Sequence, residues 1–128
     1  SKGFSVTYDL NLPAPVGKQK YKYKHKDVKT YLKEIAPART FSFIWELEAL
    51  EEMGLGEGGR WGNVILIDNE RVVNTELRFP DEFVRHKILD IIGDLYLLGC
   101  PIVGKVTAAR TGHRHNVALV RLVEEMLL

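Results

Sequence analysis

One short segment, residues 85–95 (RHKILDIIGDL), contains four polar side chains that could bind a metal ion or transfer a proton: His86, Lys87, Asp90 and Asp94. Because a helix turns about 100° per residue, these side chains share one narrow stripe opposite the isoleucines and leucines. A histidine and an aspartate four residues apart can bind one metal ion from a single face of a helix. Surface helices also carry polar stripes, however, so the spacing alone favours a solvated face over a metal site.

A second group of polar residues lies at 111–116 (TGHRHN), between a predicted strand and the start of the last predicted helix. Loops that follow strands are common positions for working histidines, and this one offers His113 and His115. The alternative is a capping turn with two exposed histidines, and taken in isolation the segment favours that interpretation.

Two further segments carry weaker signals. In residues 38–43 (ARTFSF), arginine, threonine and phenylalanine follow one another in a predicted strand, and half-buried packing is the usual role of such a pattern. Thr40 would matter only if its hydroxyl group faces a cleft. The glycine-rich segment 54–59 follows a predicted helix, whereas phosphate-binding loops follow a strand and open a helix.

Lysines occupy every even position from Lys18 to Lys26 and alternate with Gln19, Tyr21, Tyr23 and His25. Lysines interleaved with aromatic residues can bind single-stranded nucleic acid through phosphate contacts and base stacking. In a strand, however, all five lysines would lie on one face and the rings on the other, which separates charge from stacking. Protection of an edge strand is the favoured interpretation, and nucleic acid is not an expected partner.

The overall composition is that of one ordinary globular domain. The chain has 128 residues and a mass of 14.6 kDa, with 45% hydrophobic and 27% charged residues. Its net charge of +1 gives no global field that would recruit nucleic acid or an anionic membrane, and its single Cys100 excludes a disulfide framework. No run of 18 apolar residues is present, so we expect no membrane anchor.

The elements that must position these residues follow from the periodicity. Alternation predicts strands at 4–12, 18–26, 38–43 and 102–110, and a hairpin at 63–73 that turns at 68–70. Helices are predicted after the cap residue Asp27, at 44–53, at 81–98 with Asp81 as its cap, and from His113 onward. This order predicts an α+β domain with a mixed or antiparallel sheet and two main helices packed on one face.

Several of these segments together resemble one enzyme family. The strings ARTF at 38–41, LRF at 77–79, DEFVRHKILD at 81–90, GDL at 93–95 and GH at 112–113, followed by Asn116, occur in this order. They are similar to the second domain of UDP-3-O-acyl-N-acetylglucosamine deacetylase, the zinc hydrolase that commits bacteria to lipid A synthesis. The similarity extends from Ala38 to about Val123 and is loose before Ala38.

The resemblance implies a role for each matched residue. His86 and Asp90 would be two of the three protein ligands of Zn2+. His113 would stabilise the tetrahedral oxyanion and protonate the departing amine, and Asp94 would hold that imidazole and favour its charged form. Thr40 would help to polarise the scissile carbonyl.

The resemblance also implies contacts with the substrate, UDP-3-O-acyl-N-acetylglucosamine. Lys87 would bind the diphosphate. The segment 43–73 resembles a βαβ insert that lines the passage for the acyl chain, with Phe43, Ile44 and Leu47 as implied lining residues. Phe41, which precedes this segment, is a further implied contact with the substrate. Arg114 and His115 stand where the family usually has small and apolar residues.

The chain departs from the family in one further respect, because the full enzyme has two similar domains. The first domain supplies the third zinc ligand, a histidine, and the catalytic glutamate, whereas residues 1–128 resemble the second domain alone. We therefore expect weak zinc binding and negligible deacetylase activity without the missing domain. The resemblance implies a bacterial cytoplasmic enzyme that works near the inner membrane face. The alternative is a UDP-sugar binding module without catalysis.

Overall fold

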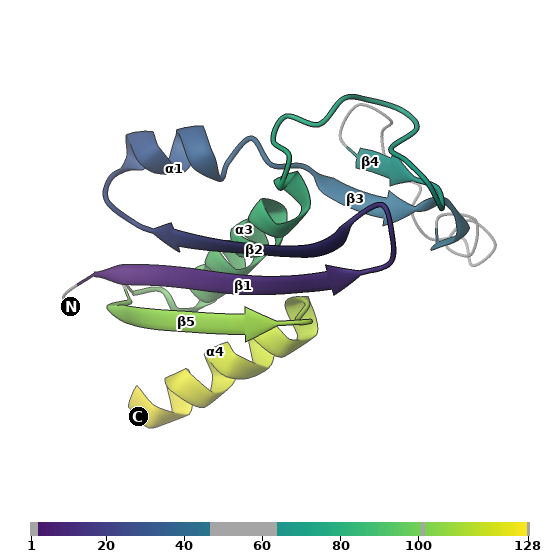
Figure 1. Ribbon diagram of the computed structural model, residues 1–128. Coiled ribbons are helices and arrows are strands. Elements are labelled where there is room, and N and C mark those ends of the chain that lie inside the picture. Colours follow the sequence, from purple (N-terminus) through teal and green to yellow (C-terminus); the bar gives the residue numbers. More distant parts are fainter. Residues whose placement is uncertain (1–2, 47–63, 101, 128) are drawn as a thin grey trace.

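The computed structural model describes residues 3–46, 64–100 and 102–127, and it has the expected α+β architecture (Figure 1). The strands are β1 (Phe4–Leu12), β2 (Gly17–Lys24), β3 (Thr40–Phe43), β4 (Val64–Ile67) and β5 (Gly104–Ala109). The helices are α1 (Val28–Glu34), α3 (Glu82–Leu95), the short 3-10 helix η1 (Tyr96–Leu98) and α4 (His113–Leu127). In the described part of the chain, no helix is long and apolar enough to cross a membrane.

The larger sheet has the strand order β2-β1-β5 and is mixed, because β1 pairs antiparallel with β2 and parallel with β5. The alternating sequence of β1 explains its two faces. Val6, Tyr8 and Leu10 are buried toward the helices, while Asp9 and Asn11 are exposed on the other face. One face of this sheet therefore builds the core and the other is polar.

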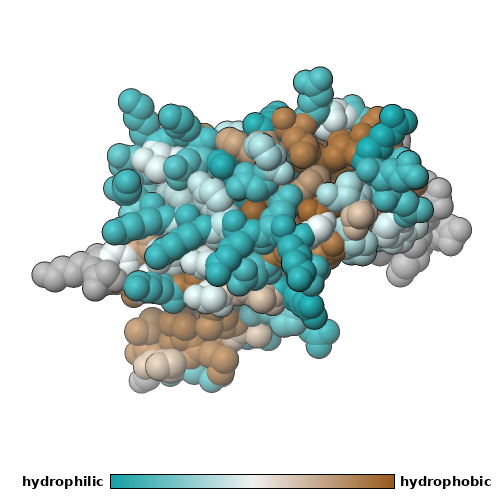
Figure 2. Space-filling model, viewed as in Figure 1, coloured by the Kyte–Doolittle hydropathy of each residue, from teal (hydrophilic) through white to brown (hydrophobic). Residues whose placement is uncertain are grey.

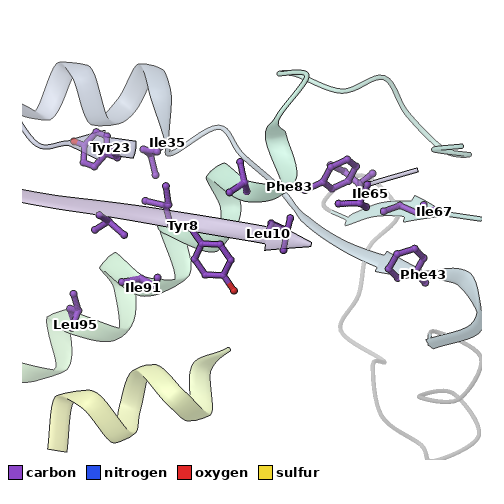
Figure 3. Close-up of a cluster of buried hydrophobic side chains, with 14 of the residues drawn as sticks. Tyr8, Leu10, Tyr23, Ile35, Phe43, Ile65, Ile67, Phe83, Ile91 and Leu95 are labelled. Carbon is purple, nitrogen blue, oxygen red and sulfur yellow. The ribbon is translucent and has the colours of Figure 1, made fainter. Parts of the chain in front are cut away.

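Helix α3 covers the buried face of this sheet, and α4 packs against α3 (Figure 1). The apolar side of α3 contributes Phe83, Val84, Ile88, Ile91 and Leu95 to the core, and Figure 3 shows several of these side chains beside those of β1. Burying the isoleucines and leucines of α3 leaves its polar stripe on another side of the helix. That side is where the candidate site forms.

Only one of the two predicted helix caps forms its capping hydrogen bond. Asp27 caps α1 as expected, since its Oδ1 accepts a hydrogen bond of 2.7 Å from the backbone N–H of Thr30. Asp81 occupies the cap position of α3, but its side chain makes no cap hydrogen bond there. Instead its Oδ1 lies 2.7 Å from Nε of Arg85, so Asp81 takes the expected cap position without forming a capping hydrogen bond. The helix predicted at 81–98 comprises α3 and η1 together, and it ends at Gly99 with φ of 73°.

The smaller sheet consists of β3 and β4, which pair in parallel. Residues 44–46 are helical, while the rest of the helix predicted at 44–53 and the glycine-rich segment lie outside the described residues. A parallel pair needs a crossover connection such as a βαβ unit. The hairpin expected at 63–73 is reduced to a single bridge between Ile67 and Val72. Asp68 explains the turn, because its Oδ1 accepts hydrogen bonds from the N–H groups of Glu70 and Arg71.

Candidate metal and acid–base site

Helices α3 and α4 bring the two polar segments of the sequence together. His86, Asp90 and Asp94 follow one another on successive turns of α3, and His113 is the first residue of α4. Nδ1 of His113 lies 2.6 Å from Oδ2 of Asp94, and its Nε2 lies 3.9 Å from Oδ1 of Asp90. The polar stripe of α3 therefore faces the first residue of α4 and is not an isolated solvated face.

His86 is held from both sides of its ring. Its Nδ1 lies 3.0 Å from the carbonyl oxygen of Ala38, and its Nε2 lies 3.2 Å from Oδ1 of Asp90. Because a carbonyl oxygen can only accept, Nδ1 must carry a hydrogen atom. Nε2 is then the nitrogen that faces Asp90. Both side chains are mostly buried, with exposed fractions of 16% for His86 and 21% for Asp90.

The surroundings of His86 act on its pKa in opposite directions. Burial lowers the pKa, whereas the hydrogen bond and negative charge of Asp90, together with the bond to Ala38, raise it, and the net result is a pKa above the usual value. The imidazole of His86 therefore keeps its second proton up to a higher pH than that of a free histidine does. A metal ion bound there would have to displace this proton.

The separation of the His86 and Asp90 donor atoms is compatible with two ligands of one tetrahedral zinc ion. Two ligand atoms at ordinary Zn–N and Zn–O distances and a tetrahedral angle lie about 3.3 Å apart, close to the 3.2 Å observed between Nε2 and Oδ1. Within residues 3–46, 64–100 and 102–127, no group of three or more His, Cys, Asp or Glu side chains could hold a metal ion. The described residues thus offer a pair of donors and not a complete set.

His113 has the geometry of an oriented acid–base group. Oδ2 of Asp94 lies 2.6 Å from its Nδ1 and also accepts a hydrogen bond of 3.0 Å from Nδ2 of Asn116. Asn116 is buried, while the His113 side chain is 67% exposed. Asp94 is therefore fixed between the two helices, and the Nε2 side of the His113 ring stays accessible. The resemblance implies no role for Asn116, although this residue stands one helical turn after His113.

The loop before His113 is fixed by a residue of β1. The buried hydroxyl group of Tyr8 donates to the carbonyl oxygen of Thr111 and accepts from the N–H of the same residue, both at 2.8 Å. Nζ of Lys87 lies 3.4 Å from the same carbonyl oxygen. The structure thus places Lys87 beside the His113 loop. Tyr8 was missed because, in the sequence, it is an ordinary inward-facing residue of an alternating strand.

A buried ion pair positions the carbonyl group that holds His86. Glu82 is fully buried and accepts hydrogen bonds from N and Nε of Arg39, both at 2.9 Å, and from N of Arg78 at 2.7 Å. Burial alone would raise the pKa of Glu82, but these bonds and the charge of Arg39 hold it below its usual value. The pair links the segment before β3 to the first turn of α3, next to Ala38.

The residues expected to contact the substrate lie along β3 and its continuation. Thr40 is exposed at the first position of β3. Phe41 packs edge-on against Phe83, with ring centroids 5.0 Å apart, and the buried Phe43 stacks on Trp45 at 4.4 Å. Ile44 is partly buried, and Leu47 lies outside the described residues.

The remaining histidines do not join the metal pair. Nδ1 of His115 accepts a hydrogen bond of 3.3 Å from the N–H of Gly112, which makes His115 a capping residue of the turn, as the alternative interpretation held. Nδ1 of His25 lies 2.8 Å from the hydroxyl group of Tyr23, at the end of β2. Of the described imidazoles, only those of His86 and His113 face the carboxylates of α3.

Comparison with known proteins gives one consistent family. The family model described as UDP-3-O-acyl N-acetylglycosamine deacetylase matches residues 1–125. Three proteins named UDP-3-O-acyl-N-acetylglucosamine deacetylase are each 48% identical to this chain. They come from Acidithiobacillus ferrooxidans (123 residues aligned), Neisseria meningitidis serogroup C (124 residues) and Xylella fastidiosa (122 residues). Each match covers 94% of this chain but only 40% of the relative. The similarity therefore includes β1 and β2, which carry none of the motifs quoted above.

Proposed function

Because this chain belongs to the UDP-3-O-acyl N-acetylglycosamine deacetylase family, we propose that it supplies two zinc ligands and the general acid for hydrolysis of an acetamide. The proposed substrate is UDP-3-O-acyl-N-acetylglucosamine, the compound in the names of the relatives. Water would replace the amine on the acetyl carbon, which releases acetate and leaves a free amino group. This step would commit the substrate to lipid A synthesis.

His86 and Asp90 are the proposed zinc ligands, and their 3.2 Å separation is the observation that carries the proposal. When bound, zinc would polarise the amide carbonyl and lower the pKa of a bound water molecule toward 7. The bond from His86 Nδ1 to Ala38 would keep Nε2 directed at the metal position, since such outer hydrogen bonds fix the tautomer of ligand histidines. Arg39 and Glu82 would hold Ala38 in place for this purpose.

His113 is the proposed general acid. Its Nδ1 is engaged by Asp94, so the proton to be transferred would sit on Nε2, 3.9 Å from Asp90 and therefore beside the proposed metal position. A positively charged ring there would stabilise negative charge on the former carbonyl oxygen and then protonate the leaving nitrogen. Asp94 and Asn116 would orient the ring without contacting the substrate.

The remaining proposed contacts bind and place the substrate. Lys87 would reach the diphosphate, and the exposed hydroxyl group of Thr40 would donate to the scissile carbonyl oxygen. The segment 43–73 would line the passage for the acyl chain through Phe43, Ile44 and Leu47, and Phe41, two positions before the segment, would add a further contact. The parallel pairing of β3 with β4 is the support for a βαβ unit in this segment.

The chain is proposed to act together with the part of the enzyme that its longer relatives carry outside the matched 40%. That partner would supply a third zinc ligand, a histidine, and a glutamate as general base, since the described residues hold only a pair of donors. We expect this chain alone to bind zinc weakly and to have negligible activity. The proposed location is the bacterial cytoplasm, near the membrane face that holds the lipid-tailed substrate.

The incomplete donor set also favours a second candidate, a UDP-sugar binding module without catalysis. Reconstitution separates the two. The chain is mixed with the separately produced partner domain and zinc, and acetate release from UDP-3-O-acyl-N-acetylglucosamine is followed. Turnover that needs both parts and is lost in His113→Ala, but kept in His115→Ala, supports the deacetylase. Tight association of the parts without turnover favours the binding module.

A further inference from the structure

The outer face of the larger sheet is strongly basic, and its lysines have no role in the proposed reaction. Strand β2 places four exposed lysines on this face, and β5 adds a fifth; we call Lys18, Lys20, Lys22, Lys24 and Lys105 the lysine face. The sheet faces the viewer in Figure 1, with α3 behind it. In Figure 2, taken from the same side, hydrophilic side chains cover these strands.

The strand register shows how the charges are spaced. Lys24 and Lys105 flank Ser5 on either side of β1, and Lys22 flanks Thr7. Alternate residues of a strand lie about 7 Å apart, and strands two apart lie about 10 Å apart. Small polar residues of β1 fill the middle, so the lysines form a broad, shallow array rather than a groove.

The lysine face has a larger positive charge than the chain as a whole. One acidic residue, Asp9, shares the face, with its Oδ1 4.0 Å from Nζ of Lys20. Five lysines and one aspartate give a charge of +4, whereas the whole chain carries +1, so all other residues together carry −3. In the part of the chain that the structure describes, no ion pair involves Lys18, Lys22, Lys24 or Lys105.

Protection of the sheet edges does not account for this pattern. Strands β2 and β5 are both edge strands of the described sheet, and charged side chains discourage pairing with other molecules. Lysine is the residue used most often for this purpose, and glutamate also serves. Edge protection therefore explains why charges are present but does not require all five to have the same sign.

The shape of the array selects one kind of polyanion. The rings of Tyr21 and Tyr23 lie on the opposite side of β2, so bases of a single-stranded nucleic acid would find no stacking surface among the lysines. The face also offers no protruding helix for a duplex groove. Flexible lysines on a flat sheet suit a plane of laterally mobile phosphates. We propose that the lysine face docks the protein on an anionic lipid bilayer.

Binding to vesicles tests this without any deacetylase assay, so its failure leaves the proposed function untouched. The protein is sedimented with vesicles of 70% phosphatidylcholine and 30% phosphatidylglycerol, or with phosphatidylcholine alone, at low and high salt. Each lysine near an anionic surface contributes about fivefold in partitioning. We expect binding only to anionic vesicles, a loss of at least about 25-fold in Lys20→Glu/Lys22→Glu, and release by salt.

The matched control is Lys29→Glu/Lys33→Glu, which makes the same charge change on exposed positions of α1. Circular dichroism confirms that both variants are folded. An equal loss in the control, or no binding of the unmodified protein to anionic vesicles at low salt, would overturn the proposal. A single-stranded oligonucleotide that binds the lysine face more tightly than the vesicles would overturn it in favour of nucleic acid.

Discussion

Nδ1 of His113 lies 2.6 Å from Oδ2 of Asp94, so the first residue of α4 is tied to a carboxylate in the last turns of α3. The same oxygen accepts the side-chain amide of the buried Asn116. Two donors from α4 thus meet one acceptor on α3. The packing of the two helices therefore sets the direction of the His113 ring.

Asp94→Ala should lower kcat of the reconstituted deacetylase and leave KM nearly unchanged, because Asp94 contacts His113 and is proposed to act on the substrate only through it. General acid–base catalysis typically contributes about 10²–10⁴-fold, which is the range expected for loss of His113 itself. A smaller loss is expected for Asp94→Ala, and a still smaller one for Asn116→Ala, which leaves the His113–Asp94 bond in place. Steady-state kinetics of acetate release would measure all three. A rise in KM with kcat unchanged would contradict the assignment.

Asp90→Ala should weaken zinc binding to this chain by at least about tenfold, the loss that even outer hydrogen-bond partners of metal ligands cause. Isothermal titration with zinc would measure the affinity. His25→Ala is the control, since the only side-chain bond of His25 in the described structure is to Tyr23, and it should bind zinc like the unmodified chain. If the two variants behave alike, the His86–Asp90 pair is not the zinc site.

Zinc affinity should also rise with pH over a window that extends above the usual pKa of a histidine. The pKa of His86 is raised, chiefly by Asp90 acting against burial, so its ring holds a proton over a wider pH range than a free histidine does. Zinc must displace that proton, and binding is therefore weakest at acid pH. Titrations at several pH values would show this rise. An affinity that levels off well below pH 6.5 would contradict it.

Tyr8→Phe should destabilise the protein by about 1–3 kcal/mol, because the N–H and carbonyl oxygen of Thr111 both lose their bond to the hydroxyl group. Amide exchange at Thr111 and Gly112 should accelerate more than exchange in α1. Urea unfolding and exchange measured by NMR test both parts. Tyr31→Phe is the matched control, since within the described residues its hydroxyl group makes no side-chain hydrogen bond, and it should cost little.

The elements and the polar stripe of α3 follow from local patterns. Periodicity places His86, Asp90 and Asp94 on one stripe because helix geometry is the same wherever a helix forms. The strand alternation of β1 likewise predicts its buried face. These predictions succeed because each depends on residues close together in the sequence.

The contacts that set the site depend on residues far apart in the sequence, and no local pattern indicates them. Tyr8 and Thr111 are separated by 103 positions, and Arg39 and Glu82 by 43. Asp81 occupies the expected cap position, but its capping hydrogen bond is absent for a related reason, since the nearby Arg85 binds its carboxylate. Asn74 explains in part why the predicted hairpin at 63–73 forms only one bridge. Its side chain accepts a hydrogen bond from the N–H of Leu66 and donates one to the carbonyl oxygen of Val64, two groups that a second strand would otherwise pair with.

Glu82→Gln tests the ion pair that holds Ala38 against His86. At neutral pH the variant leaves the mostly buried Arg39 with an uncompensated charge, and removal of one partner of a buried pair typically costs about 3–5 kcal/mol. The pKa of Glu82 is held below its usual value, so its ionised form stabilises the fold fully above about pH 4.5. This stabilisation is lost as the pH falls through the lowered pKa.

The difference in the free energy of unfolding between the unmodified protein and Glu82→Gln should therefore shrink on acidification, and urea unfolding from pH 7 to pH 3 would measure it. Glu76→Gln, at an exposed position, should change stability by no more than about 0.5 kcal/mol at any of these pH values. A gap for Glu82→Gln that stays constant with pH would mean that Glu82 is not ionised in the folded protein.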